Sequence, residues 1–166
     1  MKNLFLTRHA KSSWDNPGLA DVDRPLNGRG KKAASFMGKL IMDKGDKPDL
    51  LISSPANRAL STAKAFGKAM GLVEADINVD RTIYGAGTQQ LLKLVQDQDE
   101  LYNSIMLFGH NPTFTSFVNL LTGSNIMNVV TCGVVRIDFE FSSWTDINFG
   151  SGKLVYYEYP KKQPNA

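Results

Sequence analysis

Cysteine is almost absent from this sequence, since Cys132 is the only one among 166 residues. One cysteine cannot form an internal disulfide framework or a multi-cysteine zinc site, so both are excluded. This composition suits a reducing compartment, and we expect a cytoplasmic protein. Because Cys132 lies among valines, we expect a small buried side chain there rather than a nucleophile.

A long hydrophobic run is also missing from the first residues. The apolar stretch in MKNLFLTRHA is interrupted at Arg8, far short of a secretory core segment or of the roughly 20 residues that a membrane span needs. We therefore interpret this stretch as a strand, and we expect no membrane partner.

Clustered charge of one sign is lacking as well. The 19 Lys and Arg residues outnumber the 16 Asp and Glu residues, for a formal net charge of +3, but they are scattered along the chain. Nucleic-acid-binding proteins gather their basic residues into a stripe or run, so we expect no nucleic acid and instead an anionic substrate. No repeat or linker-like tract divides the sequence, and we expect one domain over residues 1–166.

Short apolar runs alternate with amphipathic stretches over most of the chain. The predicted strands are 3–7, 49–54, 77–80 and 104–110, and the predicted helices are 28–45, 55–71, 88–97 and 111–121. We expect Asn27 to cap the first helix, Gly45 to end it, and Pro55 to lie in the first turn of the second. The alternation predicts an α/β three-layer sandwich, with a mostly parallel central sheet and helices on both faces.

The C-terminal part breaks this alternation. Two β-branched or aromatic runs, 129–141 and 153–160, flank a turn-rich connection without a helix. This pattern predicts a C-terminal antiparallel hairpin at one side of the sheet. We expect residues 161–166 to form a frayed end.

The only two histidines both stand at the exit of a predicted core strand. Arg8 and His9 follow the first strand, His110 ends the fourth, and Arg58 lies one helical turn after the second. Ligands of open α/β sheets bind at the carboxyl ends of the strands. If the strands are parallel, these four side chains therefore meet at one edge of the sheet.

Two arginines and two histidines at one edge suit phosphoryl chemistry. The planar fork of arginine matches phosphate oxygens, and a histidine held among cations is pushed toward its neutral, nucleophilic form. A zinc site is disfavoured, because the arginines would place positive charge against the metal and no third ligand is spaced nearby. The chain lacks the G-x-S-x-G elbow of serine hydrolases, so we interpret Ser53 and Ser54 as turn residues.

Four separated motifs in the right order resemble the histidine phosphatase (phosphoglycerate mutase-like) superfamily. Arg8-His9-Ala10 resembles its Arg-His-Gly signature, RPLNGRG its entry to the first helix, SSPANRALSTA its motif with the pocket arginine, and FGHNP its segment with the second histidine. The small size and the sequence around RHAKSSWD and DVDRPLNGRG are similar to the SixA-type phosphohistidine phosphatase branch, which has no inserted cap domain.

The resemblance implies a role for each residue of these motifs. His9 would accept the phosphoryl group, Arg8 and Arg58 would bind its oxygens, and His110 would be a further donor. Ser12 stands where the family has a small polar phosphate contact. The resemblance also implies a phosphohistidine intermediate that water cleaves, with no metal and no cofactor.

The sequence departs from the family at the general acid. Many members carry a Glu shortly before a tyrosine after the third strand, but residues 81–83, before Tyr84, are Arg, Thr and Ile. The candidate general acids are Asp15, Asp21 and Asp23, in the loop between the nucleophile strand and the first helix. Aspartates in such a loop also serve as turn and capping residues.

Three neighbouring residues have roles that the sequence leaves open. Arg24 is either a further phosphate-facing cation or an ion-pair partner of the loop aspartates. Trp14 is either a substrate-facing aromatic or a lid over the core. Tyr84 either approaches the pocket from the exit of the third strand or packs in the core, and we expect core packing.

The missing Glu favours a leaving group that brings its own proton. An alkoxide needs a donated proton, whereas phosphohistidine can carry one on its other ring nitrogen. We therefore expect a metal-independent phosphatase acting on phosphohistidine in a partner protein, such as a phosphorelay or carrier domain. The alternatives are a phosphatase for small phosphate esters and, from another class, a non-catalytic phosphate- or phosphopeptide-binding module.

Overall fold

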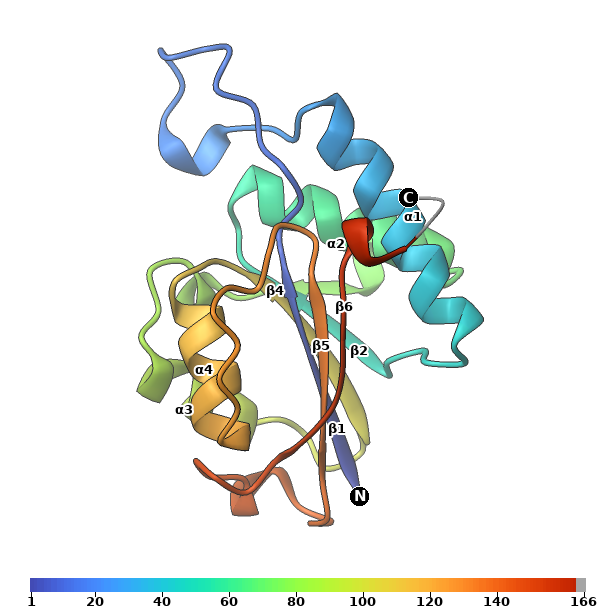
Figure 1. The fold of residues 1–166 in the computed structure, drawn as a ribbon, viewed down its shortest axis with the longest axis vertical. Helices are drawn as coiled ribbons and strands as arrows, with labels where there is room; N and C mark the ends of the chain where they lie inside the picture. Colours follow the sequence, from blue (N-terminus) through green and yellow to red (C-terminus); the bar gives the residue numbers. More distant parts are fainter. Residues whose placement is uncertain (164–166) are drawn as a thin grey trace.

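A computed structural model describes residues 1–163 and contains one six-stranded sheet (Figure 1). The strands are β1 (Lys2–Arg8), β2 (Leu50–Ser53), β3 (Ile77–Val79), β4 (Ser104–Gly109), β5 (Val134–Phe139) and β6 (Lys153–Glu158). The helices are α1 (Gly28–Asp43), α2 (Asn57–Ala69), α3 (Thr88–Gln96) and α4 (Thr113–Thr122).

The sheet has the strand order β3-β2-β4-β1-β5-β6. The first four strands in this order pair in parallel, β5 runs antiparallel to β1, and β6 runs antiparallel to β5. The central pair β4 and β1 is buried almost throughout, as expected for parallel strands covered on both faces. The predicted α/β class, the mostly parallel sheet and the C-terminal hairpin are confirmed.

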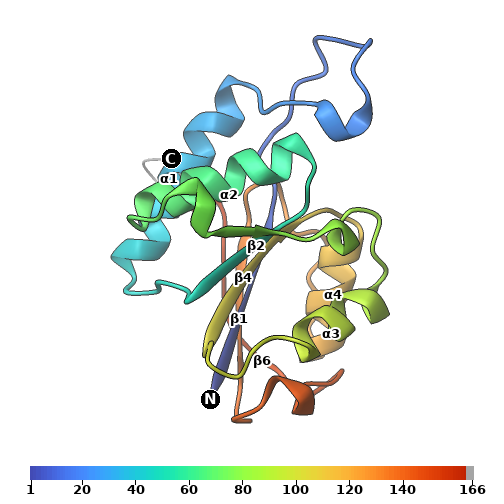
Figure 2. The same ribbon diagram turned by 180° about the vertical axis from the view of Figure 1, so that it is seen from behind.

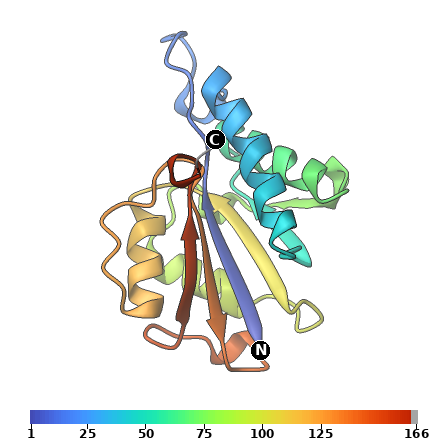
Figure 3. The same ribbon diagram turned by 45° about the vertical axis from the view of Figure 1, so that its right-hand side comes forward.

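Two helices cover each face of the sheet. Figure 3 shows α1 and α2 on one side and α3 and α4 on the other, and Figure 2 shows the same layers from behind. Side chains of β1 alternate between the two layers: Leu4 and Leu6 join the core under α3 and α4, whereas Phe5 joins the core under α1 and α2. Period-two alternation in one central strand thus links both cores.

The helix boundaries follow local chemistry, with one correction. The Asn27 side-chain oxygen accepts a hydrogen bond from the Gly30 backbone N–H at 2.8 Å, and Gly45 has a positive φ of 82° just after α1. Both are as predicted. Pro55 was expected in the first turn of α2, but the helix begins at Asn57, because Ser54 and Pro55 complete a turn in which the Ser54 hydroxyl accepts from the Ala56 N–H.

The first residues of the predicted strand 129–141 form a turn instead. Cys132 has a φ of 61°, and its N–H lies 3.1 Å from the Arg8 carbonyl oxygen and 3.0 Å from that of His9. The chain therefore bends across the end of β1 before β5 begins at Val134. As predicted, the Cys132 side chain is buried, and burial raises the pKa of its thiol.

The loop between β1 and α1 projects beyond the body of the molecule, at the top of Figure 1. We call residues 13–24 the site loop. Its base is closed by a bridge between Ser12 and Leu26 and by a hydrogen bond from the Ser13 N–H to the Pro25 carbonyl, at 2.8 Å.

The segment after β6 begins with regular structure, contrary to the prediction. Pro160–Lys162 form a single 3-10 turn, so the expected frayed end is wrong there, and residues 164–166 lie outside the described residues. Within residues 1–163, no helix has the length and apolarity to cross a membrane.

Candidate functional site

The carboxyl ends of β1, β2 and β4 meet at one edge of the sheet and bring both histidines together. His9 follows β1 directly and His110 follows β4, and their ring centroids are 5.4 Å apart. Arg58, in the first turn of α2, borders two adjoining pockets: one is also lined by Arg8 and His9, the other by His110. The four side chains singled out from the sequence therefore lie around one site.

The backbone of Ala10 fixes the orientation and the tautomer of His9. The Nδ1 atom of His9 lies 2.7 Å from the Ala10 carbonyl oxygen. Because a carbonyl only accepts hydrogen bonds, Nδ1 carries the proton and Nε2 keeps its lone pair. The Ala10 N–H donates to the Thr62 hydroxyl at 3.0 Å, and that hydroxyl donates to the Arg58 carbonyl at 2.7 Å. Helix α2 thereby holds the segment that orients His9.

Burial and positive charge keep both rings neutral. Burial, together with the positive charges of Arg58 and Arg8, lowers the pKa of His9 to about 4. Burial also lowers the pKa of His110 to about 3, together with the charges of His9 and Arg58. At neutral pH, His9 thus has a free nucleophilic nitrogen.

Two buried polar atoms of the site have no hydrogen-bond partner among residues 1–163. They are Arg8 Nε and His110 Nδ1. Arg8 donates through Nη1 to the Val129 carbonyl at 3.0 Å, and His110 Nε2 lies 2.8 Å from the Ser54 hydroxyl. Since buried polar groups are rarely left unpaired, the remaining atoms are suited to a bound ligand.

Of the three aspartates in the site loop, only Asp21 contacts arginine side chains within residues 1–163. Its Oδ2 accepts from Arg58 Nη2 at 3.0 Å and from the Tyr84 hydroxyl at 2.6 Å, and its Oδ1 accepts from Arg24 Nη1 at 3.1 Å. The hydrogen bond from Tyr84, followed by that from Arg58, lowers the pKa of Asp21 to about 2. Asp21 is therefore ionised at neutral pH, while Asp15 and Asp23 are exposed on the loop.

Tyr84 lies outside the core, and Trp14 and Ser12 both contact Arg24 beside the pocket. Tyr84 is 39 % exposed rather than packed in the core, and its ring meets His110 edge-on with centroids 5.5 Å apart. Trp14 is 76 % exposed, so it is not a lid over the core; its ring stacks on the Arg24 guanidinium at 3.2 Å. The Ser12 hydroxyl accepts a hydrogen bond from Arg24.

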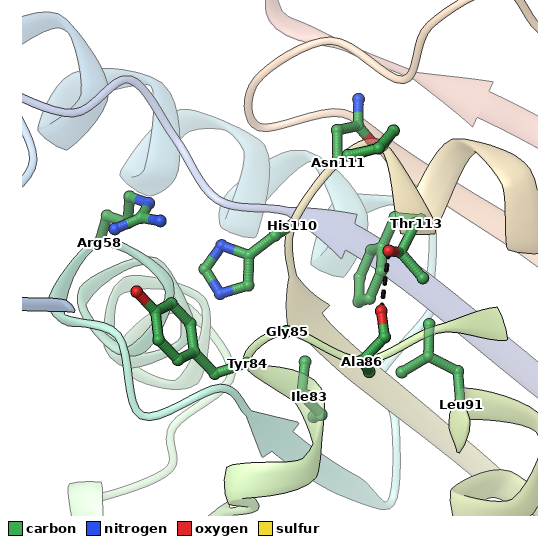
Figure 4. A pocket seen from close by; sticks show the side chains of 11 residues that line it. Arg58, Ile83, Tyr84, Gly85, Ala86, Leu91, His110, Asn111 and Thr113 are labelled. Atoms are coloured by element: carbon green, nitrogen blue, oxygen red, sulfur yellow. Dashed lines mark hydrogen bonds between the residues drawn. The ribbon is translucent and has the colours of Figure 1, made fainter. Parts of the chain in front are cut away.

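Two adjoining pockets form the site. The first, of about 390 Å³, is lined by the cations Arg8, Lys11, Arg24 and Arg58 together with His9. The second, of about 230 Å³, contains His110 and Tyr84 and again Arg58, whose guanidinium points toward the Tyr84 hydroxyl in Figure 4. Four cations around one pocket favour an anionic ligand.

Sequence reasoning missed two contacts of the second pocket. Ser54 was interpreted only as a turn residue, yet it holds His110. Its position at the exit of β2, beside Pro55, was the available signal. Tyr84 follows β3 in the same way, but its link to Asp21 joins residues 63 apart and has no sequence signature. Across residues 1–163, no group of three or more His, Cys, Asp or Glu side chains is placed to hold a metal ion.

Comparison with known proteins gives consistent results. A family model described as the histidine phosphatase superfamily (branch 1) matches residues 4–83. The crystal structure of SixA from Agrobacterium tumefaciens matches with a TM-score of 0.83 and 30% identity, over 96% of this chain and 98% of that chain.

Two further matches extend over most of this chain. The protein histidine phosphatase SixA complexed with tungstate has a TM-score of 0.77 at 19% identity, over 96% of this chain and 98% of that chain, which is a likeness of fold. An uncharacterized chloroplastic protein of Arabidopsis thaliana is 29% identical over 153 residues, which cover 87% of this chain and 70% of the plant protein.

Proposed function

This chain belongs to the histidine phosphatase superfamily and is a phosphatase, and we propose that it transfers the phosphoryl group to His9 and dephosphorylates phosphohistidine on a partner protein. The observation that carries the proposal is the hydrogen bond between His9 Nδ1 and the Ala10 carbonyl. This bond leaves Nε2 with a lone pair beside two arginines. A module that only bound phosphate would not need a nucleophilic nitrogen there.

The proposed reaction has two displacement steps. His9 Nε2 attacks phosphorus and forms a P–N bond, while the bond to the leaving group breaks and its electron pair departs with that group. Water then attacks the phosphorylated His9: its oxygen bonds to phosphorus, the P–N electron pair returns to Nε2, and inorganic phosphate leaves. Throughout both steps His9 Nδ1 keeps its proton, which stays hydrogen-bonded to the Ala10 carbonyl oxygen.

The charge of the phosphoryl group is balanced by side chains in this proposal. Arg8 and Arg58 supply fixed positive charge, and the unpartnered Arg8 Nε and His110 Nδ1 atoms supply directed contacts. For His110 such a contact requires the proton to lie on Nδ1, with Nε2 accepting from Ser54. Because donors aimed at the equatorial oxygens stabilise the transition state, we propose that the reaction needs no metal ion.

The proposed substrate class follows from the surroundings of the site. A projecting loop and the exposed Trp14 border the pocket, and none of residues 1–163 forms a cap domain over it. An open site of this kind accommodates a histidine on a protein surface. The match at 30% identity to the putative phosphohistidine phosphatase SixA from Agrobacterium tumefaciens supports the same class of substrate.

The test is a pair of histidine variants measured on 4-nitrophenyl phosphate. His9→Ala is expected to abolish phosphate release, because the nucleophile is lost. His110→Ala is the matched control: it removes a buried imidazole too, but is expected to retain a rate about 10²- to 10³-fold below the wild type, the cost of losing one donor. Near-normal turnover by folded His9→Ala would contradict the proposal.

The substrate class is tested separately. A histidine-phosphorylated carrier domain is expected to lose its phosphate faster than sugar phosphates do at equal concentration. Equal rates on sugar phosphates would instead indicate a phosphatase for small esters.

A further inference from the structure

An exposed carboxylate lies at the mouth of the site, in a protein that lacks the Glu expected before Tyr84. The carboxylate belongs to Asp21, on the site loop, and it is bound by Tyr84 and Arg58. Tyr84 in turn packs against His110, whose ring is tilted by 51° to that of His9. Three side-chain contacts, through Tyr84 and His110, therefore link Asp21 to the proposed nucleophile.

The burial of these groups shows on which side of the phosphoryl group Asp21 lies. His9 is 9 % exposed, whereas the side chain of Asp21 is 51 % exposed. Displacement at phosphorus is in line, so the leaving group departs opposite the attacking nitrogen. With His9 at the bottom of the site, the leaving group faces outward, toward the exposed side chains of Asp21 and Tyr84. Figure 4 shows the Tyr84 hydroxyl directed toward Arg58.

The Asp21 carboxylate has capacity for one more hydrogen bond. A carboxylate offers about four acceptor positions. Three side-chain donors reach it within the described structure: Arg58, Tyr84 and Arg24. The fourth position is available to a donor that arrives with the substrate, because half of the side chain remains exposed.

We propose, on the basis of the proposed function, that Asp21 is a specificity-determining residue that selects phosphoryl groups linked to a protonated imidazole. Its carboxylate accepts a hydrogen bond from the distal N–H of the substrate ring. The P–N bond to that ring breaks, its electron pair goes to the released nitrogen, and the distal nitrogen keeps its proton, so a neutral imidazole leaves. A leaving group that departs as an oxyanion is repelled by the same carboxylate.

His9 itself has a comparable arrangement, in which the ring nitrogen that does not bind phosphorus donates a hydrogen bond to a fixed acceptor. The distal nitrogen of His9 donates to the Ala10 carbonyl, so the phosphorylated His9 also carries its proton away from phosphorus. Asp21 supplies the equivalent acceptor for the substrate ring. The two guanidinium groups and the Tyr84 hydroxyl hold Asp21 in its ionised form, which has no proton to donate and therefore suits an acceptor.

The experiment compares Asp21→Asn with the wild type on three substrates: phosphoimidazole, 4-nitrophenyl phosphate and phosphoserine. The first has a protonated nitrogen leaving group, the second a weakly basic oxygen, and the third a strongly basic oxygen. Glu140→Gln removes one negative charge from an exposed position outside the site and is the control for net charge. The readout is kcat/KM for each substrate and each variant.

Asp21→Asn is expected to lower kcat/KM on phosphoimidazole by about tenfold to a hundredfold, the effect of losing a hydrogen bond to a charged group. Its kcat/KM on 4-nitrophenyl phosphate and phosphoserine is expected to stay the same or rise, and Glu140→Gln is expected to match the wild type on all three substrates.

Three results would overturn the proposal. An equal loss on all three substrates would mean that Asp21 only positions Arg58, and a loss confined to phosphoserine would make it a general acid. No loss on phosphoimidazole would mean that the Asp21 carboxylate does not bind the substrate ring. Failure of the proposed function is distinguishable, because the wild type would then leave phosphoimidazole intact.

Discussion

The surroundings of the His9 imidazole set its tautomer and its charge. The Ala10 carbonyl selects the tautomer, and burial beside Arg58 and Arg8 selects the charge. Neither property is encoded in the histidine itself, whose ordinary pKa of about 6.5 would leave a fraction protonated at neutral pH. The same residue on an exposed loop would be a weaker and less directed nucleophile.

The charge state of the two histidines can be measured directly by nuclear magnetic resonance. The chain contains only two histidines, so their ring C–H signals are easily assigned with the His9→Ala and His110→Ala variants. We expect titration midpoints near pH 4 for His9 and near pH 3 for His110. A midpoint near 6.5 for either ring would show that burial and the arginines do not keep it neutral.

The lowered pKa values also predict how stability depends on pH. In the unfolded chain both rings take up protons near pH 6.5, whereas in the folded protein they do so only near pH 4 and pH 3. Between these limits the unfolded state binds more protons. The two histidines are therefore expected to decrease the free energy of unfolding as pH falls through this window.

The contact between helix α1 and the segment after β1 positions the base of the site loop. A Cβ on Gly30 would lie 2.1 Å from the Lys11 carbonyl oxygen, and the Asn27 N–H donates to the same oxygen at 2.9 Å. The absence of a side chain at Gly30 thus allows α1 to approach the backbone just beyond His9. This approach holds Lys11 and Ser12 at the pocket.

Gly30→Ala tests the close approach, and Gly28→Ala is its matched control in the same helical turn. A Cβ on Gly28 has no heavy atom within 4 Å. We expect Gly30→Ala to lower the free energy of unfolding by about 1–3 kcal/mol and to reduce activity, as overpacking does. Gly28→Ala is expected to be neutral or slightly stabilising. Equal free energies of unfolding by urea denaturation would argue against a close contact.

Across the whole molecule, the features that depend on chain order could be predicted, and those that depend on loop contacts could not. The alternation of strands and helices predicted the layers, and parallel strands place Arg8, His9 and His110 at one edge because their carboxyl ends coincide. The turn at Cys132 depends on carbonyls of β1 and its exit. The Asp21–Tyr84 contact joins the loop after β1 to the segment after β3. Local sequence carries no information on such tertiary pairings.

The central claim is that the phosphoryl group passes through His9, and trapping the phosphorylated protein tests it most directly. The protein is mixed with a ³²P-labelled substrate, quenched without acid within one turnover, digested and sequenced by mass spectrometry. The account predicts that the label is found on the peptide containing His9 and that its bond to the protein is acid-labile. The His9→Ala variant is expected to carry no label. Label on another residue, or full turnover without any labelled protein, would contradict it.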